Sequence, residues 1–391
     1  MTNDNNFALT KESSRARAGE LITRHGAVPT PVFMPVGSQG TVKTLTPDEL
    51  HDIGFKMVLA NTYHLYLRPG IPTIKELGGL HSFMGWDGAI LTDSGGYQVF
   101  SLSGLRRVTD DGVTFRSHID GGRHFISPEK AIELQETLGA DIIMAFDECP
   151  PIDATPAVVE QAMRRTHRWA ERCLKIHQDS SQQLFAIVQG GLDPGLRRTS
   201  ADYLVSLGFP GYAIGGLSLG EPKAVTFNIV EQTAACLPPE KPRYLMGVGS
   251  PEDIVEGVAR GIDIFDSALP TRVARNGGLY TGSGRFNITN SSFKNAASPI
   301  ETACGCYTCR HFSAAYLHHL FNARELLAYR LATIHNLFFM KDLMRRTRQS
   351  IIDNAFDEFK NGFLAGYRAV DEEIRLSQKK KWLERRSKPG G

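Results

Sequence analysis

Three aspartates stand at the ends of short apolar runs, and their chemistry gives the first indication of what the chain does. Asp93 closes AILTD, Asp147 closes DIIMAFD and Asp266 closes IDIFD. If the runs are parallel strands, their carboxyl ends meet at one mouth and the three carboxylates lie together. Carboxylates held close together resist simultaneous ionisation, which raises the pKa of one of them and suits acid, base or nucleophilic roles. Because a single aspartate at a strand end is as often a helix cap or a turn residue, the inference rests on the set.

The side chains beside these aspartates suit a planar ring bound near an anomeric carbon. A carboxylate nucleophile with a second carboxyl to move the proton fits a transition state that resembles an oxocarbenium ion. Tyr97 follows Asp93 by one turn and either stacks on a ring or packs at the rim. Asp147 and Gln189 offer acceptors and donors for the edge of a nucleobase. The pattern therefore predicts glycosyl chemistry on a base.

Two arginines follow Asp266 in the segment LPTRVARNGG. We expect Arg272 and Arg275 on a loop there, with phosphate as their ligand, because guanidinium groups bind phosphates and base edges through paired hydrogen bonds. The chain has Lys+Arg 44 and Asp+Glu 42, a net charge of +2, so nucleic-acid binding has to come from such a local patch. The basic run at 340–348 either extends the patch or forms a solvated helix face.

Three cysteines and a later histidine have the make-up of a metal site. The set is Cys304, Cys306, Cys309 and His335. Three thiolates and an imidazole complete a tetrahedral zinc site with no open position for water, so the metal is expected to be structural. The fourth ligand stays open, because His311, His318 and His319 are nearer in the sequence. His311 is too close to fold back, and the other two are expected at the surface or an interface of a helix.

Regular alternation of strands and helices must position these residues. The apolar runs lie at 31–37, 57–64, 89–96, 141–148, 184–191, 212–218, 243–249 and 262–268, and helical patterns at 127–140, 156–178, 194–208 and 250–261. Eight strands joined by helices predict an α/β fold, a (β/α)8 TIM barrel, in preference to an open sheet, because no G-x-G-x-x-G follows an early strand. Ser127-Pro128 and Ser250-Pro251 predict helix starts with a capping hydroxyl.

The pattern changes after the last strand, which predicts the domain organisation. We expect a barrel with an N-terminal extension at 1–278 and an inserted zinc-binding subdomain at 279–340, with a long helix at 314–336. Helices packing on the barrel are expected at 341–378, and a disordered basic tail at 379–391.

Composition excludes several classes of protein. Charged residues at 22% and hydrophobic residues at 41% are ordinary for a globular domain and argue against disorder, collagen and coiled coil. The polar residues 1–20 lack the apolar core of a secretory signal, so a cytoplasmic protein is expected. The longest uncharged stretch, 203–220, is broken by Pro210 and several glycines, so we expect no membrane span.

Specific motifs connect the candidate residues. They are LTDSGGYQVFSL, MAFDECPP, VQGG, YAIGGLSLGE, YLMGVGSPEDI, DIFDSALPTRVARNG and C-x-C-x-x-C with its distant histidine. With them the chain resembles the tRNA-guanine transglycosylases, the queuine tRNA-ribosyltransferase family, and most of all its bacterial branch. The resemblance implies a (β/α)8 barrel with a zinc subdomain. It also implies a glycosyltransferase that exchanges guanine at the wobble position of tRNA for a 7-deazaguanine base on the route to queuosine.

The resemblance assigns roles to individual residues. Asp266 would be the nucleophile that holds a covalent tRNA intermediate, and Asp93 the general acid/base for the incoming base. Arg272 and Arg275 would contact the anticodon loop. The residues that would bind the base are Ser94, Asp147, Gln189, Gly216 and Leu217, with Tyr97 and Met246 on its two faces.

The resemblance also bears on the incoming base and on partners. Cys149 and the bulky Leu219 resemble the bacterial pocket and leave little room for the cyclopentenediol of queuine, so 7-aminomethyl-7-deazaguanine is expected, with queuine the alternative. One structural zinc, no ATP or redox cofactor, and a homodimer around the zinc subdomain are implied. Phe312, Tyr316 and His319, a stripe at i, i+4, i+7 spacing, would form a dimer contact or pack in the core.

Three other functions compete with this one. A zinc-stapled barrel could hydrolyse nucleosides or glycosides, which predicts release of a base without replacement and leaves Arg272 and Arg275 without a role. A catalytically silent binding subunit is opposed by the intact Asp93 and Asp266. The third is a related enzyme that acts on DNA bases. Contact with the ribose 2′-hydroxyl distinguishes RNA from DNA, and the sequence does not reveal such a contact.

Overall fold

The computed structural model describes residues 6–102, 106–179, 181–373 and 376–377. The basic tail expected at 379–391 lies outside the described residues. No helix in these four ranges combines the length and the apolarity needed to cross a bilayer.

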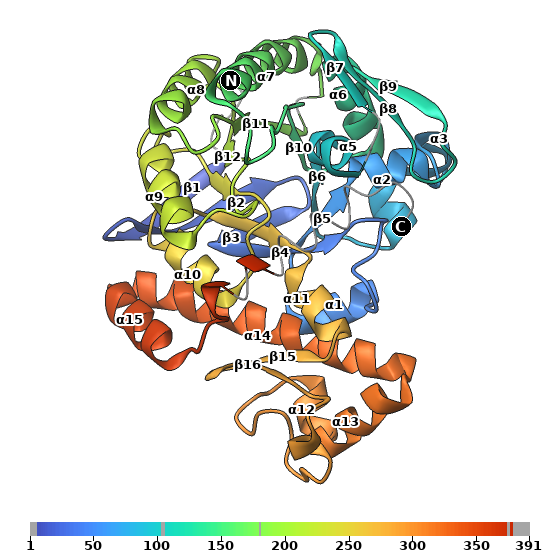
Figure 1. Ribbon diagram of the computed structural model, residues 1–391, viewed down its shortest axis with the longest axis vertical. Helices are drawn as coiled ribbons and strands as arrows, with labels where there is room; N and C mark the ends of the chain where they lie inside the picture. Colours follow the sequence, from blue (N-terminus) through green and yellow to red (C-terminus); the bar gives the residue numbers. More distant parts are fainter. Residues whose placement is uncertain (1–5, 103–105, 180, 374–375, 378–391) are drawn as a thin grey trace.

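The core of the molecule is a closed barrel of eight parallel strands (Figure 1). In pairing order these are β10 (Ile142–Met144), β11 (Gln183–Val188), β12 (Tyr212–Ile214), β13 (Arg243–Leu245), β14 (Ile264–Ser267), β4 (Val32–Gly37), β5 (Met57–Asn61) and β6 (Ala89–Asp93). Each apolar run supplies one strand, so the predicted fold class is confirmed. The strands are continuously apolar because both faces are buried: in β5, Met57 and Leu59 belong to the barrel interior, whereas Val58 and Ala60 pack with the helices.

Helices surround the barrel. They are α1 (Pro47–Ile53), α2 (Thr62–Leu67), α3 (Ile71–Glu76), α4 (Gly79–Met84), α5 (Gly96–Leu102), α6 (Pro128–Leu138), α7 (Pro156–Ile176), α8 (Pro194–Ser206), α9 (Lys223–Ala234), α10 (Pro251–Val258) and α11 (Leu269–Arg275). The Ser127 hydroxyl caps α6 by accepting the Lys130 N–H at 3.2 Å, as predicted. Helix α10 begins at Pro251 with Ser250 at its N-cap, as predicted, but the capping hydroxyl is wrong, because the Ser250 hydroxyl accepts no N–H of α10. Glu252 and Asp253 lie in the first turn of α10, where negative charge interacts favourably with the positive end of the helix dipole.

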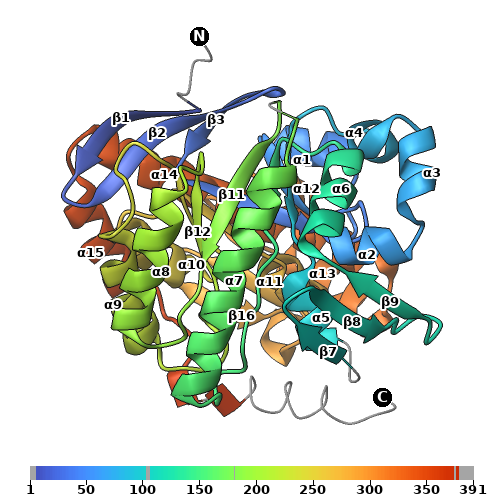
Figure 2. The ribbon, with the colours of Figure 1, turned by 90° about the horizontal axis from the view of Figure 1, so that it is seen from above.

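Two antiparallel sheets lie at opposite ends of the barrel (Figure 2). The sheet of β1 (Phe7–Ser13), β2 (Ala16–Thr23) and β3 (Gly26–Thr30) precedes β4 and closes the floor, where Phe7, Leu21 and Val28 join the interior cluster. The sheet of β7 (Arg106–Thr109), β8 (Gly112–Arg116) and β9 (Arg123–Ile126) is inserted between α5 and α6. It therefore belongs to a connection that leaves the carboxyl end of a strand, on the mouth side.

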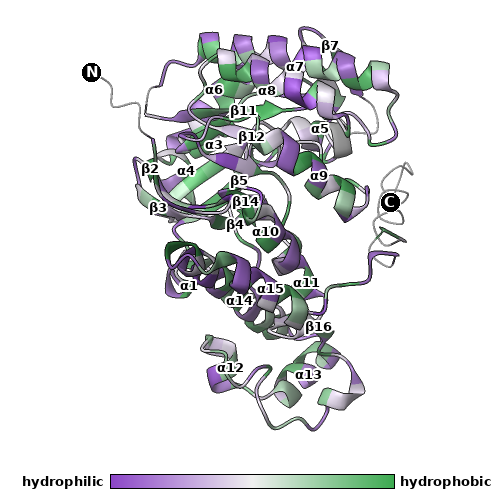
Figure 3. Ribbon diagram, turned by 90° about the vertical axis from the view of Figure 1, so that its left-hand side faces the viewer, coloured by the Kyte–Doolittle hydropathy of each residue, from purple (hydrophilic) through white to green (hydrophobic). Residues whose placement is uncertain are grey.

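The remaining elements form the C-terminal part. They are β15 (Gly278–Thr281), β16 (Gly284–Asn287), η1 (Ser291–Phe293), α12 (Tyr307–His311), α13 (Ala314–Ala323), α14 (Leu326–Ile352) and α15 (Phe356–Gly366). The single helix expected at 314–336 is wrong, because Arg324 adopts a left-handed φ of 59° and separates α13 from α14. Figures 1 and 3 show α14 between the barrel and the α12–α13 region, so the boundary at 340/341 falls inside one continuous helix.

Candidate active site

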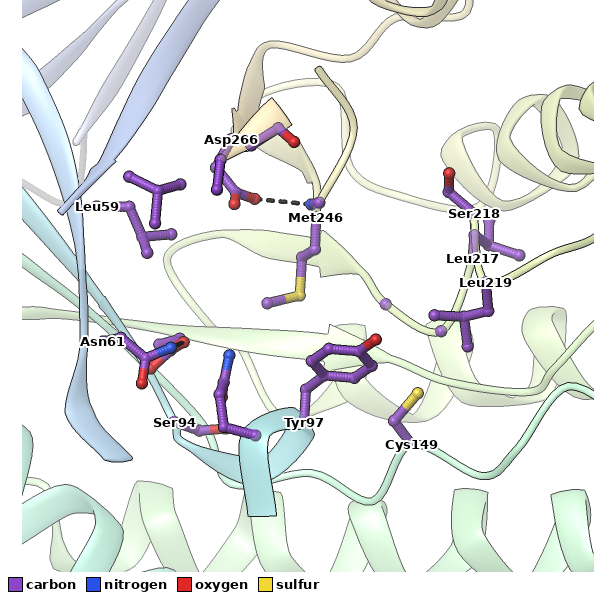
Figure 4. A pocket seen from close by; sticks show the side chains of 18 of the residues that line it. Leu59, Asn61, Ser94, Tyr97, Cys149, Leu217, Ser218, Leu219, Met246 and Asp266 are labelled. Carbon is purple, nitrogen blue, oxygen red and sulfur yellow. Dashed lines mark hydrogen bonds between the residues drawn. The ribbon is translucent and has the colours of Figure 1, made fainter. Parts of the chain in front are cut away.

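A pocket of about 320 Å³ opens at the carboxyl ends of the barrel strands (Figure 4). Of the residues that the sequence singled out, those lining it are Asp93, Ser94, Tyr97, Asp147, Cys149, Gln189, Gly216, Leu217, Leu219, Met246, Asp266 and Arg272. The structure therefore brings the three strand-end aspartates together, as the barrel topology requires. Arg275 is the exception, because it does not line this pocket.

Asp266, at the end of β14, is held by two neutral donors. The Tyr244 hydroxyl donates to its Oδ1 at 2.5 Å, and the Gly247 N–H donates to the same atom at 2.7 Å. No described residue donates to Oδ2. Burial raises the pKa of this carboxyl, and the two hydrogen bonds oppose the rise. A carboxylate with one oxygen fixed and one unengaged is oriented for attack at a single position.

Asp93, at the end of β6, is fixed by the start of α2. The Asn61 amide donates to its Oδ2, and the Thr62 N–H donates to its Oδ1 at 3.0 Å. Burial raises the pKa of Asp93 to about 7; hydrogen bonds oppose the rise, and the charges of Asp266 and Asp147 add to it. The carboxyl therefore exchanges a proton near neutral pH, which suits a general acid/base.

Asp147 is the third carboxylate and lies across the pocket on the chain that follows β10. It accepts hydrogen bonds from Gln189 Nε2 at 2.8 Å and from the Ser94 hydroxyl at 3.2 Å. Burial raises its pKa to about 6, against these hydrogen bonds. A Cβ at Gly96 would lie 2.7 Å from the Asp147 carbonyl oxygen, so the glycine lets α5 approach this residue.

A buried arginine that the sequence did not single out supports the Gln189 side of the pocket. Arg197 of α8 donates to three backbone carbonyls at 2.8–3.0 Å, those of Val188, Gly191 and Gly215. It thereby ties together the ends of β11 and β12. Gly216 has a left-handed φ of 69°, and a Cβ there would lie 2.5 Å from Gln189 Oε1, so only glycine suits this position.

Glu221 supports another wall of the pocket and was also missed. Its buried carboxylate accepts the N–H groups of Ser218, Leu219 (2.9 Å) and Gly220 (3.1 Å). This fixes the loop that carries Leu219. Figure 4 shows Leu219 and Cys149 at the same end of the pocket, away from Asp266. The only sequence signal was the position of Glu221 at the end of YAIGGLSLGE.

Arg272 and Arg275 lie on helix α11, so the prediction of a loop is wrong. The chain turns directly from β14 into the helix: the Arg272 N–H bonds to the Ala268 carbonyl at 3.0 Å, with Pro270 in the first turn. Arg272 is exposed at the pocket. Arg275, one turn on, is half-buried, and burial and then the charge of Arg272 lower its pKa.

The predicted metal ligands come together near α14. His335 Nδ1 lies 3.8, 3.5 and 3.4 Å from the sulfurs of Cys304, Cys306 and Cys309. A tetrahedral zinc with bonds of about 2.3 Å to sulfur and about 2.1 Å to nitrogen separates such atoms by about 3.6 Å. The Tyr280 carbonyl lies 2.6 Å from His335 Nε2, which places the proton there and frees Nδ1 for a metal. The cluster can hold a metal ion and fits a zinc-binding site.

The nearer histidines do not join this cluster. His318 is buried and bonds to the Ile288 carbonyl and to Asn322, both at 2.8 Å, so its expected surface position is wrong. His319 is exposed. The stripe of Phe312, Tyr316 and His319 is only partly helical, because Phe312 precedes α13. The Phe312 ring stacks on Tyr316, with 5.2 Å between the ring centroids.

The fold and the pocket define the class of the protein. It is a (β/α)8-barrel enzyme whose pocket is lined by three buried carboxylates, a set of groups that suits glycosyl transfer at a base.

Comparison with known proteins makes the class specific. Residues 12–369 match the family described as Queuine tRNA-ribosyltransferase. The chain is 60% identical over 386 residues to the queuine tRNA-ribosyltransferase of Dehalococcoides mccartyi, with 98% of each chain covered. It is 56% identical over 363 residues to that of Pelotomaculum thermopropionicum, with 92% of this chain and 98% of the relative covered. The chain belongs to the queuine tRNA-ribosyltransferase family, which confirms the resemblance and the inferred enzyme class, a tRNA-guanine transglycosylase.

Proposed function

We propose that the protein exchanges guanine at the wobble position of tRNA for 7-aminomethyl-7-deazaguanine, through a covalent bond between Asp266 and the ribose. The observation that carries the proposal is the presence in one pocket of two carboxyls with different surroundings. No described group donates to Oδ2 of Asp266, whereas Asp93 accepts hydrogen bonds at both oxygens and burial raises its pKa to about 7. The first suits a nucleophile and the second a proton carrier.

The exchange follows as two displacements. An Asp266 oxygen bonds to C1′ as the bond from C1′ to N9 of guanine breaks, and the departing base takes the carboxyl proton of Asp93. The incoming base then gives its own N9 proton to the Asp93 carboxylate while N9 attacks C1′ and the bond to Asp266 breaks. Each displacement inverts C1′, so the configuration is retained.

The remaining pocket residues would select and hold the base. Asp147 and Gln189 are bonded to each other and would bind the base edge with Ser94, Gly216 and Leu217. Tyr97 and Met246 would cover its faces. Leu219 and Cys149 narrow one end of the pocket, which supports a small 7-aminomethyl group over the larger queuine substituent. Arg272 and Arg275 would bind the anticodon loop. A tRNA substrate supports a cytoplasmic location for the enzyme.

Guanine exchange tests the function. Wild-type protein should incorporate labelled guanine into unmodified tRNA that carries guanine at the wobble position, and Asp266→Asn should not. The matched control is Asp202→Asn, on the exposed face of α8, which should exchange like wild type. The aminomethyl base and queuine are then compared as unlabelled competitors. The one that displaces labelled guanine from the tRNA more efficiently is the incoming base. Release of guanine without exchange would instead indicate a hydrolase, and exchange into DNA alone a DNA-specific relative.

We propose that the Cys₃His cluster holds one structural zinc. The ligand set is complete without water, and His335 is also bonded to the β15 backbone at Tyr280, so the metal would join α12, α14 and β15. One zinc per chain by elemental analysis, with a lower unfolding temperature after chelation, is expected. A Cys304→Ser variant that keeps full metal content and stability would contradict this.

We propose a homodimer formed through the same region. A groove of about 600 Å³ between α1, α12 and α14 is lined by Tyr307, Phe312 and Leu327, and Leu326 beside it is 80% exposed. Exposed apolar residues of this size next to a groove are typical of an interface. Leu326→Lys should shift the sedimentation of the protein from dimer to monomer, whereas Leu77→Lys, an exposed leucine of the α3–α4 turn, should not.

A further inference from the structure

The outer face of the β7–β8–β9 sheet carries three arginines. Residues paired across adjacent strands share a face, and the register pairs Arg107 with Thr114, Thr114 with Phe125, and Arg116 with Arg123. The opposite face holds Val113, Phe115 and Ile126, which are buried. The outward face is therefore the one with Arg107, Arg116 and Arg123, all exposed, around a Phe125 that is 50% exposed.

This arrangement is unfavourable for the free protein. Arg116 and Arg123 stand directly opposite each other, and like charges in that position destabilise a sheet. None of the three arginines forms an ion pair with any residue in the described ranges, although Arg165, Arg168 and Arg172 nearby all do. Arg116 donates only to a neutral group, the Gly121 carbonyl at 3.4 Å. In a chain of net charge +2, three guanidinium groups without a described carboxylate partner on one small face are a local feature that a polyanion would complement.

Two hydrogen bonds join the sheet to the helix that borders the pocket. The Tyr63 hydroxyl lies 3.0 Å from His118 Nδ1, and the Tyr66 hydroxyl lies 3.0 Å from His124 Nδ1. Both tyrosines belong to α2, whose first residue, Thr62, donates its N–H to Asp93. One short helix therefore contacts the proposed acid/base on one side and carries the arginine sheet on the other, on the mouth side of the barrel (Figure 2).

We propose that this face, defined by Arg107, Arg116, Arg123 and Phe125, binds the sugar–phosphate backbone of the tRNA outside the base pocket. The inference rests on the proposed function. Guanidinium groups bind phosphate oxygens, and an exposed aromatic ring among them provides an apolar surface for a ribose. Contacts of this kind position the polynucleotide without reading its sequence, so they act on tRNA affinity and leave the chemistry at C1′ unchanged.

Charge removal tests the proposal in the full-length, metal-loaded protein. The variant is Arg107→Gln/Arg116→Gln/Arg123→Gln. Its KM for tRNA in guanine exchange should rise by roughly tenfold or more, with kcat unchanged within about twofold, because three phosphate contacts are lost. The slope of log affinity against log salt, measured by filter binding, should fall by about 2 to 3.

The control removes the same charge at the floor of the barrel. It is Lys56→Gln/Lys175→Gln/Lys241→Gln, whose positions precede β5, end α7 and precede β13. If the arginine variant matches this control in KM and salt slope, the face does not bind tRNA, the proposal is overturned and an acidic protein becomes the candidate partner. Failure of wild type to exchange guanine would overturn the proposed function instead, and filter binding would still test the surface.

Discussion

Two buried aspartates flank strand β10, and they differ in their hydrogen-bond partners and in the direction of their pKa shifts. Asp141, at the floor, accepts from His25 Nδ1 at 2.7 Å and from the Ile90 N–H at 2.8 Å, with His81 Nε2 at 3.4 Å. Burial raises its pKa, but these partners outweigh burial and the net shift is downward. Asp147, at the mouth, has only neutral donors, and its pKa rises to about 6.

The difference shows what each end of the barrel is for. At the floor a buried carboxylate meets imidazoles and a backbone N–H, so its ionised form is satisfied and stabilises the fold. At the mouth Asp93, Asp147 and Asp266 share one pocket and have raised pKa values, so their ionised forms oppose folding. Such a cluster persists in a site whose ligand supplies the missing partners.

Replacing an aspartate by asparagine at the mouth and at the floor of the barrel should give the largest difference in kcat. Asp266→Asn should lower kcat for guanine exchange by about 10⁴-fold or more, because an amide cannot form the covalent intermediate. Asp141→Asn should leave kcat within about twofold, measured per folded protein. Comparable losses of kcat in both variants would remove the distinction between floor and mouth.

The pH dependence sharpens the assignment of Asp93. In the proposed exchange, release of guanine needs its protonated form, so kcat/KM for tRNA should fall about tenfold per pH unit above about 7. Attack by the incoming base needs the carboxylate, so kcat/KM for the base should fall on the acid side. The apparent pKa of that profile should be below 7, because the proposed intermediate has Asp266 esterified, so that its charge would no longer raise the pKa of Asp93. Initial rates from pH 5 to 9 with each substrate varied give both profiles.

Asp93→Asn is the control for these profiles. This variant should lose most of the activity and both pH dependences, the alkaline fall with tRNA and the acid fall with the base. The reason is that the proposal gives proton transfer to Asp93 alone. Two profiles that bend in the same direction would mean that Asp93 does not alternate between acid and base.

Stability should respond to pH with opposite sign at the two ends. Folding raises the pKa of Asp93 from 3.8 to about 7, so its penalty is full above pH 7 and disappears as the pH falls toward 4. The stability of Asp93→Asn relative to wild type should therefore be about 2 to 3 kcal/mol more favourable at pH 8 than at pH 5.

Asp141 supplies the opposite sign. Folding lowers its pKa, so its contribution is full above the unfolded value and is lost as the pH falls through the lowered value. Asp141→Asn should cost about 2 to 4 kcal/mol at neutral pH, and less in strong acid. Urea unfolding of both variants at several pH values measures these differences, and equal pH dependence in the two would contradict the comparison.

The sequence predicted the mouth better than its supports. Eight apolar runs located the eight strands, and the three that end in aspartate located the carboxylates, because a parallel barrel places all its strand ends together. It did not reveal Arg197 or Glu221, since their partners are backbone groups that any sequence supplies. Local periodicity also failed at Arg324, where a left-handed residue splits an otherwise continuous helical pattern.

Glu221 tests a third kind of buried carboxylate and gives the smallest expected effect. Its two oxygens accept hydrogen bonds from three consecutive N–H groups and, at 2.7 Å, from the Thr226 hydroxyl. The carboxylate therefore holds the conformation of the loop that carries Leu219. In Glu221→Gln one oxygen becomes an NH₂ group that faces N–H donors, and the loop loses part of its anchorage. The KM for the incoming base should rise by about three- to tenfold, a loss of roughly 1 kcal/mol, with the KM for tRNA unchanged. Thr226→Val removes only one of these bonds and should have a smaller effect on the same constant. A selective loss of kcat in Glu221→Gln would place Glu221 with the mouth aspartates, whereas a selective change in KM for the base makes it the support for the wall that Leu219 forms.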